Sequence, residues 1–339
     1  MASSISHSEA RVPKLLLGLL ATALLTWGAS AAYSLWLNPE SRFLRAAGQI
    51  KRAWAQKMTR EHGTKYLFTG SSSCLFSIDG ERLEQQGVPS VNMGLFLSVG
   101  AKTMTEWTLS EARPGDSLVV AFEPGVLSQN VMPTATAIQF CHVMGSPQWL
   151  RGVLDPPGPG GLEAMLALRP GGYHACTLLG KLLLRRPMFR YATTDLHPSG
   201  WVETRATGVI DGAAGGAAPL SPEGQRLLRS LAEWGRTNRV RVCHALPVAY
   251  CRAGMLDSVQ RSNARFLLEV SQFLPVLEDR RLGVNTNASL FADTGWHFTA
   301  AGIAQRSDEL AEPLRAWRMW KLDELRSIAT NGVAPFATP

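Results

Sequence analysis

An uninterrupted apolar stretch opens the hydrophobic pattern of this chain. Residues 15–37 read LLLGLLATALLTWGASAAYSLWL and contain no charged side chain. At 1.5 Å per helical residue, such a stretch is long enough to cross a hydrocarbon core of about 30 Å. A buried helix of that length in a water-soluble fold would normally carry a polar stripe, and this stretch has none. We therefore expect a membrane-spanning helix, preceded by an N-terminal tail at 1–14.

A cleaved signal peptide is the competing interpretation of the same stretch. Arg11 and Lys14 would form its basic region, and Ala29-Ser30-Ala31 is similar to a cleavage site. The apolar run continues beyond that site to Leu37, which favours a retained anchor. The flanking charges do not decide the orientation, because five basic residues follow within 42–57 and large domains cross membranes largely regardless of such charges.

Beyond a polar, helical connector at 38–62, short apolar runs alternate with segments of helical pattern. The run SLVVAF at 117–122 is almost wholly apolar, as in strands that are covered on both faces. This alternation predicts βαβ units and a parallel sheet. The expected strands are 65–69, 90–93, 117–122 and 240–245, and the expected helices are 78–86, 101–112, 223–237, 256–277 and one that follows residue 302.

The middle of the chain departs from this pattern. Residues 152–172 and 207–222 are rich in glycine and proline, which is typical of loops and linkers. Between them, residues 178–187 are apolar and basic. We interpret residues from about 145 to 222 as an insertion that covers or flanks a site, within a single domain that spans 63–339.

Composition sets limits on the function rather than naming one. A hydrophobic share of 45% is ample for a core and excludes a disordered chain. The net charge of +7 suits an anionic membrane surface or a polyanionic substrate, but the basic residues are scattered and no nucleic-acid-binding motif occurs. Five cysteines are present without a CxxC pair or a Cys/His ligand spacing, so we expect neither a metal nor a cofactor.

Two polar clusters could together carry chemistry. A Gly-Ser-Ser-Ser turn at 70–73 follows the first expected strand, at the edge of a parallel sheet where sites usually form. A serine needs a base to become a nucleophile, and His297, oriented by Asp293, precedes the last helix. Each cluster alone is a weak signal, because serine also caps helices and such an Asp/His pair also occurs by chance. Their combination is stronger.

In this arrangement the chain resembles the SGNH, or GDSL-like, hydrolase superfamily. Ser72, in Gly70-Ser71-Ser72, stands where that family has its nucleophile, and Asn92-Met93-Gly94 looks like its second block. Asp293 and His297 look like its closing block. The resemblance implies a flavodoxin-like, three-layer α/β/α sandwich around a central parallel sheet. It also implies an oxyanion hole formed by the backbone amides of Ser72 and Gly94.

Three departures from the family pattern bear on catalysis. Ser71 replaces the usual acidic residue, and one extra residue separates Asp293 from His297. The third block of the family supplies an asparagine to the oxyanion hole, whereas the corresponding strand end here reads FEPG at 122–125. Losing one such donor costs about 100- to 1000-fold in rate. Either Asn130 or the insertion fills that place, or the reaction is slow, or the site no longer catalyses.

The layout is most similar to membrane-anchored SGNH-like proteins of cell-envelope polysaccharide acylation. That similarity implies a serine esterase or O-acyltransferase that acts on acyl, chiefly acetyl, esters of an envelope or exported polysaccharide. It further implies a single-pass protein of the bacterial inner membrane, with residues from 40 onward in the periplasm. A membrane acyltransferase is a possible partner.

A catalytically degenerate scaffold is the alternative function. It would bind polysaccharide or assemble with a membrane acyltransferase or an export complex. An unrelated nucleotide-binding domain is disfavoured, because the sequence contains neither GxGxxG nor a P-loop. Glu123 could face the site or cap a turn, and His244 at a strand end is more simply a buried core histidine.

Overall fold

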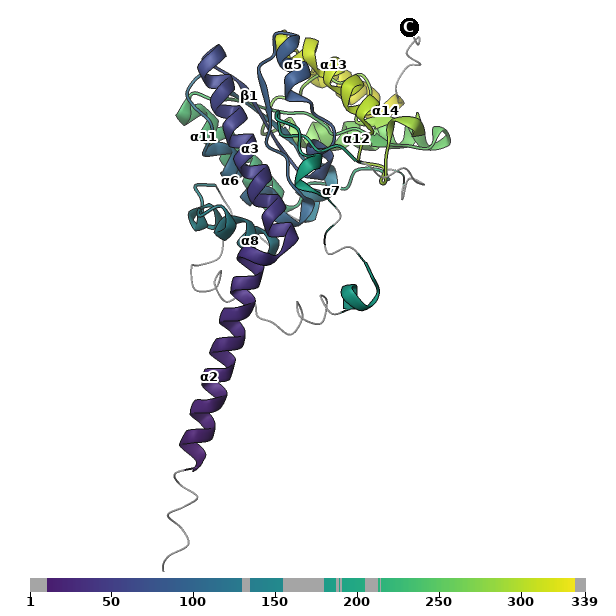
Figure 1. Ribbon diagram of the computed structural model, residues 1–339. Coiled ribbons are helices and arrows are strands. Elements are labelled where there is room, and N and C mark those ends of the chain that lie inside the picture. Colours follow the sequence, from purple (N-terminus) through teal and green to yellow (C-terminus); the bar gives the residue numbers. More distant parts are fainter. Residues whose placement is uncertain are drawn as a thin grey trace, which may run out of the picture.

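A parallel sheet forms the centre of the molecule (Figure 1). The computed structural model describes residues 11–129, 135–154, 180–186, 189, 191–204, 213 and 215–332. Its principal elements are α2 (Arg11–Ala32), η1 (Tyr33–Leu37), α3 (Pro39–His62), β1 (Tyr66–Gly70), α4 (Ser72–Leu75), α5 (Gly80–Gln85), β2 (Ser90–Asn92), α6 (Ala101–Leu109), β3 (Ser117–Ala121), α7 (Pro124–Gln129), α8 (Ala135–Val143), α11 (Pro222–Asn238), β4 (Arg241–His244), β5 (Ala249–Tyr250), α12 (Leu256–Val270), β6 (Val284–Asn285), α13 (Ala300–Arg315) and α14 (Leu322–Asn331).

The strand order is β2-β1-β3-β4, and all three pairings are parallel. The chain passes from β1 to one neighbour, β2, and then crosses to the other neighbour, β3. The strand order therefore reverses at the junction of β1 and β3. In open parallel sheets, ligands usually bind at the carboxyl ends of the strands beside such a junction. Each strand that the hydrophobic pattern predicts is present within one or two residues of its expected bounds.

Helices cover both faces of this sheet. Alternate residues of the central strands belong to two separate hydrophobic clusters, because successive side chains of a strand point to opposite faces. One cluster includes residues of α3, α6 and α11, and the other includes residues of α5 and α13. Figure 1 shows these two groups of helices on opposite sides of β1. The fold is thus α/β with a central parallel sheet between helical layers.

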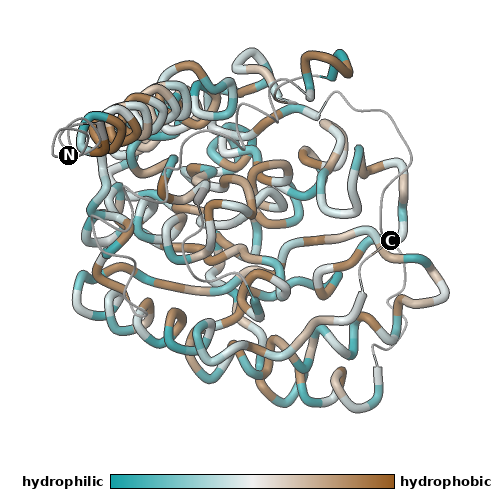
Figure 2. The backbone as a smooth tube through the Cα atoms, turned by 90° about the horizontal axis from the view of Figure 1, so that it is seen from below, coloured by the Kyte–Doolittle hydropathy of each residue, from teal (hydrophilic) through white to brown (hydrophobic). Residues whose placement is uncertain are grey.

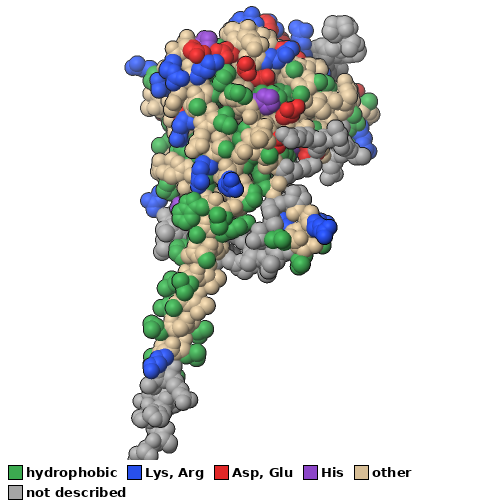
Figure 3. Space-filling model, viewed as in Figure 1, with side chains coloured by type: hydrophobic (Ala, Val, Ile, Leu, Met, Phe, Trp, Pro, Cys, Tyr) green, Lys and Arg blue, Asp and Glu red, His purple; other side chains and the backbone are tan. Residues whose placement is uncertain are grey.

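One N-terminal helix, Val12–Leu37, is long and apolar enough to cross a membrane. It projects from the domain as α2, with apolar side chains along its length (Figure 3). Figure 2, seen from below, places α2 at one edge of the domain. The last turn of the span, η1, is attached to the domain, since Arg45 donates to the Leu35 carbonyl at 2.9 Å and Gln139 to that of Ser34 at 3.4 Å.

The connector expected at 38–62 is helical, but it belongs to the core of the domain. Its apolar residues recur at the three- and four-residue spacing of one helix face, and this face is buried against the sheet. The buried members are Phe43, Leu44, Ala47, Trp54, Ala55 and Met58. The membrane helix therefore continues directly into an element on which the fold depends.

The helix expected at 256–277 ends early, at Val270. Pro275 has no backbone N–H and disfavours a helical conformation of the residue before it, so the helix cannot continue through this segment. The chain turns instead, and the Pro275 carbonyl accepts a hydrogen bond of 2.8 Å from the N–H of His244. Val276 then forms a parallel bridge with His244, which extends the sheet beyond β4.

The expected insertion, about 145–222, is described only in part, and residues 155–179 and 205–212 lie outside the described residues. Its described segment 191–202 forms an antiparallel bridge between Leu196 and Val202. The N–H of Val202 donates to the Leu75 carbonyl at 3.3 Å. This part of the insertion therefore packs directly against α4.

Candidate active site

The turn that carries Ser72 is a short helix, α4, at the carboxyl end of β1. Ser71 is its N-cap, and the Ser71 Oγ accepts a hydrogen bond of 3.4 Å from the N–H of Ser73. Gly70 has to be glycine, because a Cβ at this position would lie 2.3 Å from the Ala121 carbonyl oxygen and 2.4 Å from the Cys74 Cβ. The tight packing of β1 on β3 thus determines where the turn begins.

Distant segments of the chain satisfy the carbonyl groups at the end of this turn. The Asn92 side chain donates from Nδ2 to the carbonyls of Cys74 at 2.9 Å and Ile78 at 2.8 Å. The N–H of Phe298 donates to the Phe76 carbonyl at 3.3 Å. The last carbonyls of a helix have no partner within the helix, so these bonds fix its position. Ser72 therefore stands on a turn that β2, the insertion and the final loop all hold.

Asp293 and His297 lie side by side on the loop before α13. An antiparallel bridge between Phe291 and Phe298 closes this loop, and the N–H of Ala292 donates to the His297 carbonyl at 2.8 Å. The Asp293 Oδ1 and the His297 Nδ1 are 2.9 Å apart. A carboxylate in this position favours the tautomer with a proton on Nδ1 and leaves Nε2 as the base. The loop thus brings together the pair expected from the sequence.

Phe76 links this pair to the serine turn. The rings of Phe76 and His297 lie 4.2 Å apart between centroids. Phe76 is also the residue whose N–H donates to the Ser72 carbonyl, at 3.0 Å. Phe76 therefore contacts the imidazole through its ring and the Ser72 carbonyl through its backbone N–H.

No hydrogen bond joins Ser72 to His297 within the described part of the chain. Ser72 is partly exposed and His297 is 9% exposed, so both residues border the solvent. The structure therefore forms the Asp293–His297 half of the expected triad as a bonded pair, and Phe76 is the residue that contacts both this pair and the Ser72 turn. In many enzymes the bond between nucleophile and base is long or absent until substrate binds.

The three expected oxyanion donors differ in whether the donor group already has an acceptor. The N–H of Ser72 has no acceptor among the described residues and is available to a ligand. The N–H of Gly94 is not available in this conformation, because it donates to the Asn92 Oδ1 at 2.9 Å. Asn130 lies outside the described residues. Of the two described donors, only the Ser72 N–H is therefore without an acceptor.

A hydrogen bond between Ser71 and Glu123 lies where the strand order reverses. The sequence alone does not show that these two residues meet. Ser71, fully buried, donates from Oγ to the Glu123 Oε2, which joins the carboxyl ends of β1 and β3. Glu123 is also buried. A hydroxyl bound to a carboxylate is a strong interaction in such surroundings. Because Ser71 directly precedes Ser72, this bond makes Glu123 a positioning residue for the serine turn.

Lys51 is a further residue that sequence reasoning missed. It is fully buried and donates from Nζ to the carbonyls of Asn92, at 2.7 Å, and Gly200. Burial lowers the pKa of Lys51 to about 7, against a smaller raising effect of Cys74. The signal was present, since Lys51 falls on the apolar face of α3. It ties the membrane-proximal helix to the residue that holds the serine turn.

An aromatic cluster flanks the same turn on the insertion side. Tyr191 lies 5.1 Å from Phe76 and stacks on Phe96 at 5.5 Å between ring centroids. Phe43 of α3 lies 5.6 Å from Phe96. The described part of the insertion therefore flanks the serine turn with aromatic rings.

The remaining candidate residues have structural roles. His244 is fully buried, and burial lowers its pKa to about 4 against a smaller raising effect of the Phe122 backbone, so it is a neutral core histidine. The four described cysteines, at 74, 141, 243 and 251, are free, and Cys176 lies outside the described residues. Burial raises the pKa of the Cys74, Cys141 and Cys243 thiols to about 12, which makes them poor nucleophiles.

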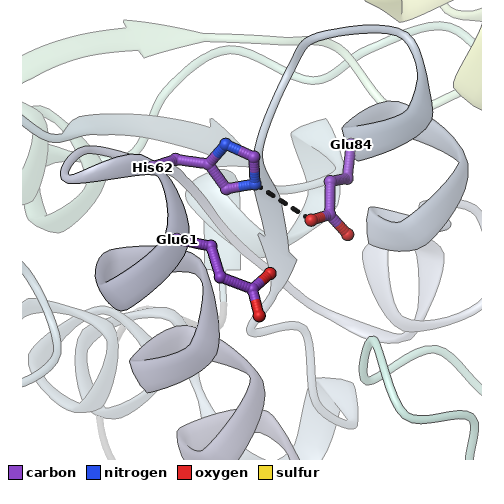
Figure 4. A group of neighbouring side chains, drawn as sticks. All are labelled: Glu61, His62 and Glu84. Carbon is purple, nitrogen blue, oxygen red and sulfur yellow. Dashed lines mark hydrogen bonds and ion pairs between the residues drawn. The ribbon is translucent and has the colours of Figure 1, made fainter.

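One surface cluster has the composition of a metal site. Glu61, His62 and Glu84 present ligand atoms within 4.8 Å of one another, and His62 lies 2.9 Å from Glu84 (Figure 4). Lys57 lies 3.5 Å from Glu61 and 3.6 Å from Glu84. One ammonium group thus lies within ion-pair distance of both carboxylates. The cluster is explained as an ion-pair network that joins α3 to α5.

No protein-family model, curated protein or solved structure matches this chain.

Proposed function

We propose that this chain is a membrane-anchored SGNH-like serine esterase or O-acyltransferase, acting on acyl esters of a cell-envelope or exported polysaccharide. The observation that carries the proposal is the Asp293–His297 pair, with 2.9 Å between Oδ1 and Nδ1. Its imidazole packs on Phe76, four residues after Ser72 in the turn that follows the first strand. The α/β fold and its reversed strand order support the same proposal.

The reaction follows from the chemistry of these groups. The His297 Nε2 takes the proton from the Ser72 Oγ, which attacks the acyl carbon, while Asp293 stabilises the imidazolium that forms. The N–H of Ser72 donates to the developing oxyanion. The alcohol leaves with the proton from His297, and an acyl-serine remains. Water or a sugar hydroxyl, activated by the same imidazole, then takes the acyl group and frees Ser72.

The membrane helix gives this chemistry a location. Ser72 follows Leu37, the last residue of the span, by only 35 positions, which supports a site near the membrane surface. We propose that the domain faces the periplasm from the inner membrane, where acylated envelope polymers are found. A membrane acyltransferase that delivers acyl groups is a fitting partner there.

Hydrolysis of an activated acetyl ester, such as p-nitrophenyl acetate, tests the proposal on the full chain in detergent. We expect turnover by the wild type and a loss of at least about 100-fold in Ser72→Ala and in His297→Ala. His62→Ala is the matched histidine control, since His62 is exposed and belongs to the surface ion pairs. Equal rates in all four proteins would refute the proposed chemistry.

A non-catalytic scaffold remains the second candidate function, and one observation favours it. The Gly94 N–H is engaged by Asn92, so a complete oxyanion hole requires a rearrangement of that side chain. A scaffold would bind polysaccharide equally well before and after Ser72→Ala and His297→Ala. It would also show no acyl turnover in the wild type.

A further inference from the structure

Residues 180–186, here called the basic leucine segment, expose three consecutive leucines to solvent. The exposed fractions are 61% for Leu182, 83% for Leu183 and 65% for Leu184. Such a contiguous apolar surface on a folded domain usually marks a site of interaction with another protein or a membrane. The site described above does not involve these residues.

The basic leucine segment has a defined conformation that keeps its leucines outward. The Leu184 N–H donates to the Gly180 carbonyl at 3.0 Å, and the Arg186 N–H donates to the Lys181 carbonyl at 2.8 Å. Arg185, with a φ of 50°, takes the left-handed conformation that closes this turn. The backbone is thus satisfied internally, and the leucine side chains have no part in holding the turn together.

Basic residues flank the leucines on both sides. Lys181 precedes them, and Arg185 and Arg186, both exposed, follow them. Leucines combined with lysine and arginine are typical of segments that lie in a membrane interface. There, the apolar side chains enter the acyl region and the cations remain at anionic headgroups.

The basic leucine segment lies on the face of the domain from which the membrane helix emerges. Burial raises the pKa of Glu40, and the positive charge of Lys181 opposes this effect, so the two side chains are close. Glu40 follows the end of the apolar span, Leu37, by three residues. Figure 1 shows the segment as a short teal helix at the level of the upper end of α2.

The length of the membrane helix places the bilayer surface at this level. Ser30 and Ser34 are buried and residues 31–33 are half-buried, so the free part of the helix ends near residue 29. At 1.5 Å per residue, residues 12–29 measure about 27 Å, close to the hydrocarbon thickness of about 30 Å. The headgroups of a bilayer crossed by α2 would therefore lie against the face that carries the exposed leucines.

We propose that the basic leucine segment is a second membrane contact, with its leucines in the bilayer interface and its two exposed arginines on anionic phospholipid headgroups. The occupant is the bilayer that α2 crosses. This contact, together with α2, would give the domain two points of attachment to the bilayer and so fix its tilt on the membrane. The proposal does not depend on the chemistry of Ser72.

Photo-crosslinking of the full chain in lipid nanodiscs tests this proposal. A benzophenone amino acid replaces Leu183 in one variant and, as the matched control, Leu322 in another. Leu322 is 45% exposed and begins α14, which lies away from α2 in Figure 1. In nanodiscs that contain phosphatidylglycerol, we expect lipid adducts at position 183 to exceed those at 322 at least about threefold.

Charge removal supplies the second arm of the same experiment. Arg185→Gln and Arg186→Gln are combined with the probe at position 183. In anionic nanodiscs we expect lipid adducts to fall by about fivefold or more, with a smaller change in zwitterionic nanodiscs. Lipid adducts at 183 no more frequent than at 322, or adducts formed mainly with a second protein chain, would overturn the proposal.

Discussion

Gly94 donates its backbone N–H to the Asn92 side chain over 2.9 Å, within the block from which an oxyanion donor was expected. The same side chain donates from Nδ2 to the carbonyls of Cys74 and Ile78, which precede and follow Phe76 in the chain. Asn92 is thus the clamp between the second strand and the serine turn. An oxyanion role for Gly94 requires this clamp to open.

Close packing around Gly94 predicts a large effect of adding one methyl group. A Cβ there would lie 2.6 Å from the Leu75 backbone nitrogen and 3.0 Å from the Cys74 Cβ, so α4 would have to move. We expect Gly94→Ala to lower the free energy of unfolding by about 1–3 kcal/mol, as overpacking does elsewhere. Chemical denaturation of the full chain in detergent, followed by tryptophan fluorescence, measures the change.

Gly125→Ala is the control for that substitution. Gly125 lies in α7, and a Cβ there would meet no atom within 4 Å. We expect no loss of stability, or a gain of up to about 1 kcal/mol from the better helix propensity of alanine. An equal loss in both variants would show that the contacts around Gly94 are not the cause.

Asp293→Asn tests whether the carboxylate orients the imidazole. Asparagine has nearly the same size, but its amide can stabilise the other tautomer of His297 and cannot stabilise an imidazolium. We expect ester hydrolysis to fall by about 100- to 10,000-fold, with the melting temperature little changed. Asp257→Asn, at an exposed position in α12, should leave both quantities unchanged. Full activity in Asp293→Asn would exclude this carboxylate from the reaction.

A double-mutant cycle tests the bond between Ser71 and Glu123. Because both residues are buried and one is ionisable, we expect a coupling free energy of about 1.5–3 kcal/mol between Ser71→Ala and Glu123→Ala. The exposed pair Arg226–Glu223 supplies the comparison, with about 0.2–1 kcal/mol expected. A coupling for the buried pair no larger than for the exposed pair would contradict the positioning role of Glu123.

Lys51 predicts a specific dependence of stability on pH. Its pKa in the folded protein, about 7, lies below the ordinary lysine value of 10.5, so between these values the unfolded chain binds more protons. The free energy of unfolding should therefore rise from pH 7 toward pH 10, with a slope of at most about 1.4 kcal/mol per pH unit from this group. Lys51→Met should remove that slope.

Measurement of unfolding free energies of both proteins between pH 6 and pH 10 checks this prediction. The variant also loses two hydrogen bonds to backbone carbonyls, so it should be the less stable protein at high pH. Its disadvantage should shrink as the pH falls to 7. Parallel curves for the two proteins would show that Lys51 keeps its ordinary pKa.

The hydrophobic pattern predicted most of the secondary structure, for local reasons. Short runs such as 117–122 form strands because both of their faces are covered, and the apolar stretch 15–37 forms a helix outside the core. One expectation was confirmed in its bounds but not in its surroundings, and another was wrong in extent. The connector expected at 38–62 is helical over Pro39–His62, and its apolar face is buried in the core. The helix that begins at Leu256 ends at Val270, and Pro275 explains its end.

The candidate site was predictable only where its residues are neighbours in sequence. Asp293 and His297 lie four positions apart on one short loop, so their contact is a local property. The contacts of Ser71 with Glu123 and of Lys51 with Asn92 span 52 and 41 positions, and they depend on strand order and helix packing. No spacing rule reveals such pairs. For the same reason, the engagement of the Gly94 amide could not be predicted.

Reaction of the full chain with a fluorophosphonate probe tests the central claim most directly, because only a serine activated by a base attacks phosphorus at a useful rate. Peptide mapping by mass spectrometry identifies the modified residue. We expect a single adduct on Ser72 in the wild type and its loss in His297→Ala, with His62→Ala labelled like the wild type. A wild type without the adduct on Ser72, or undiminished labelling in His297→Ala, would contradict it.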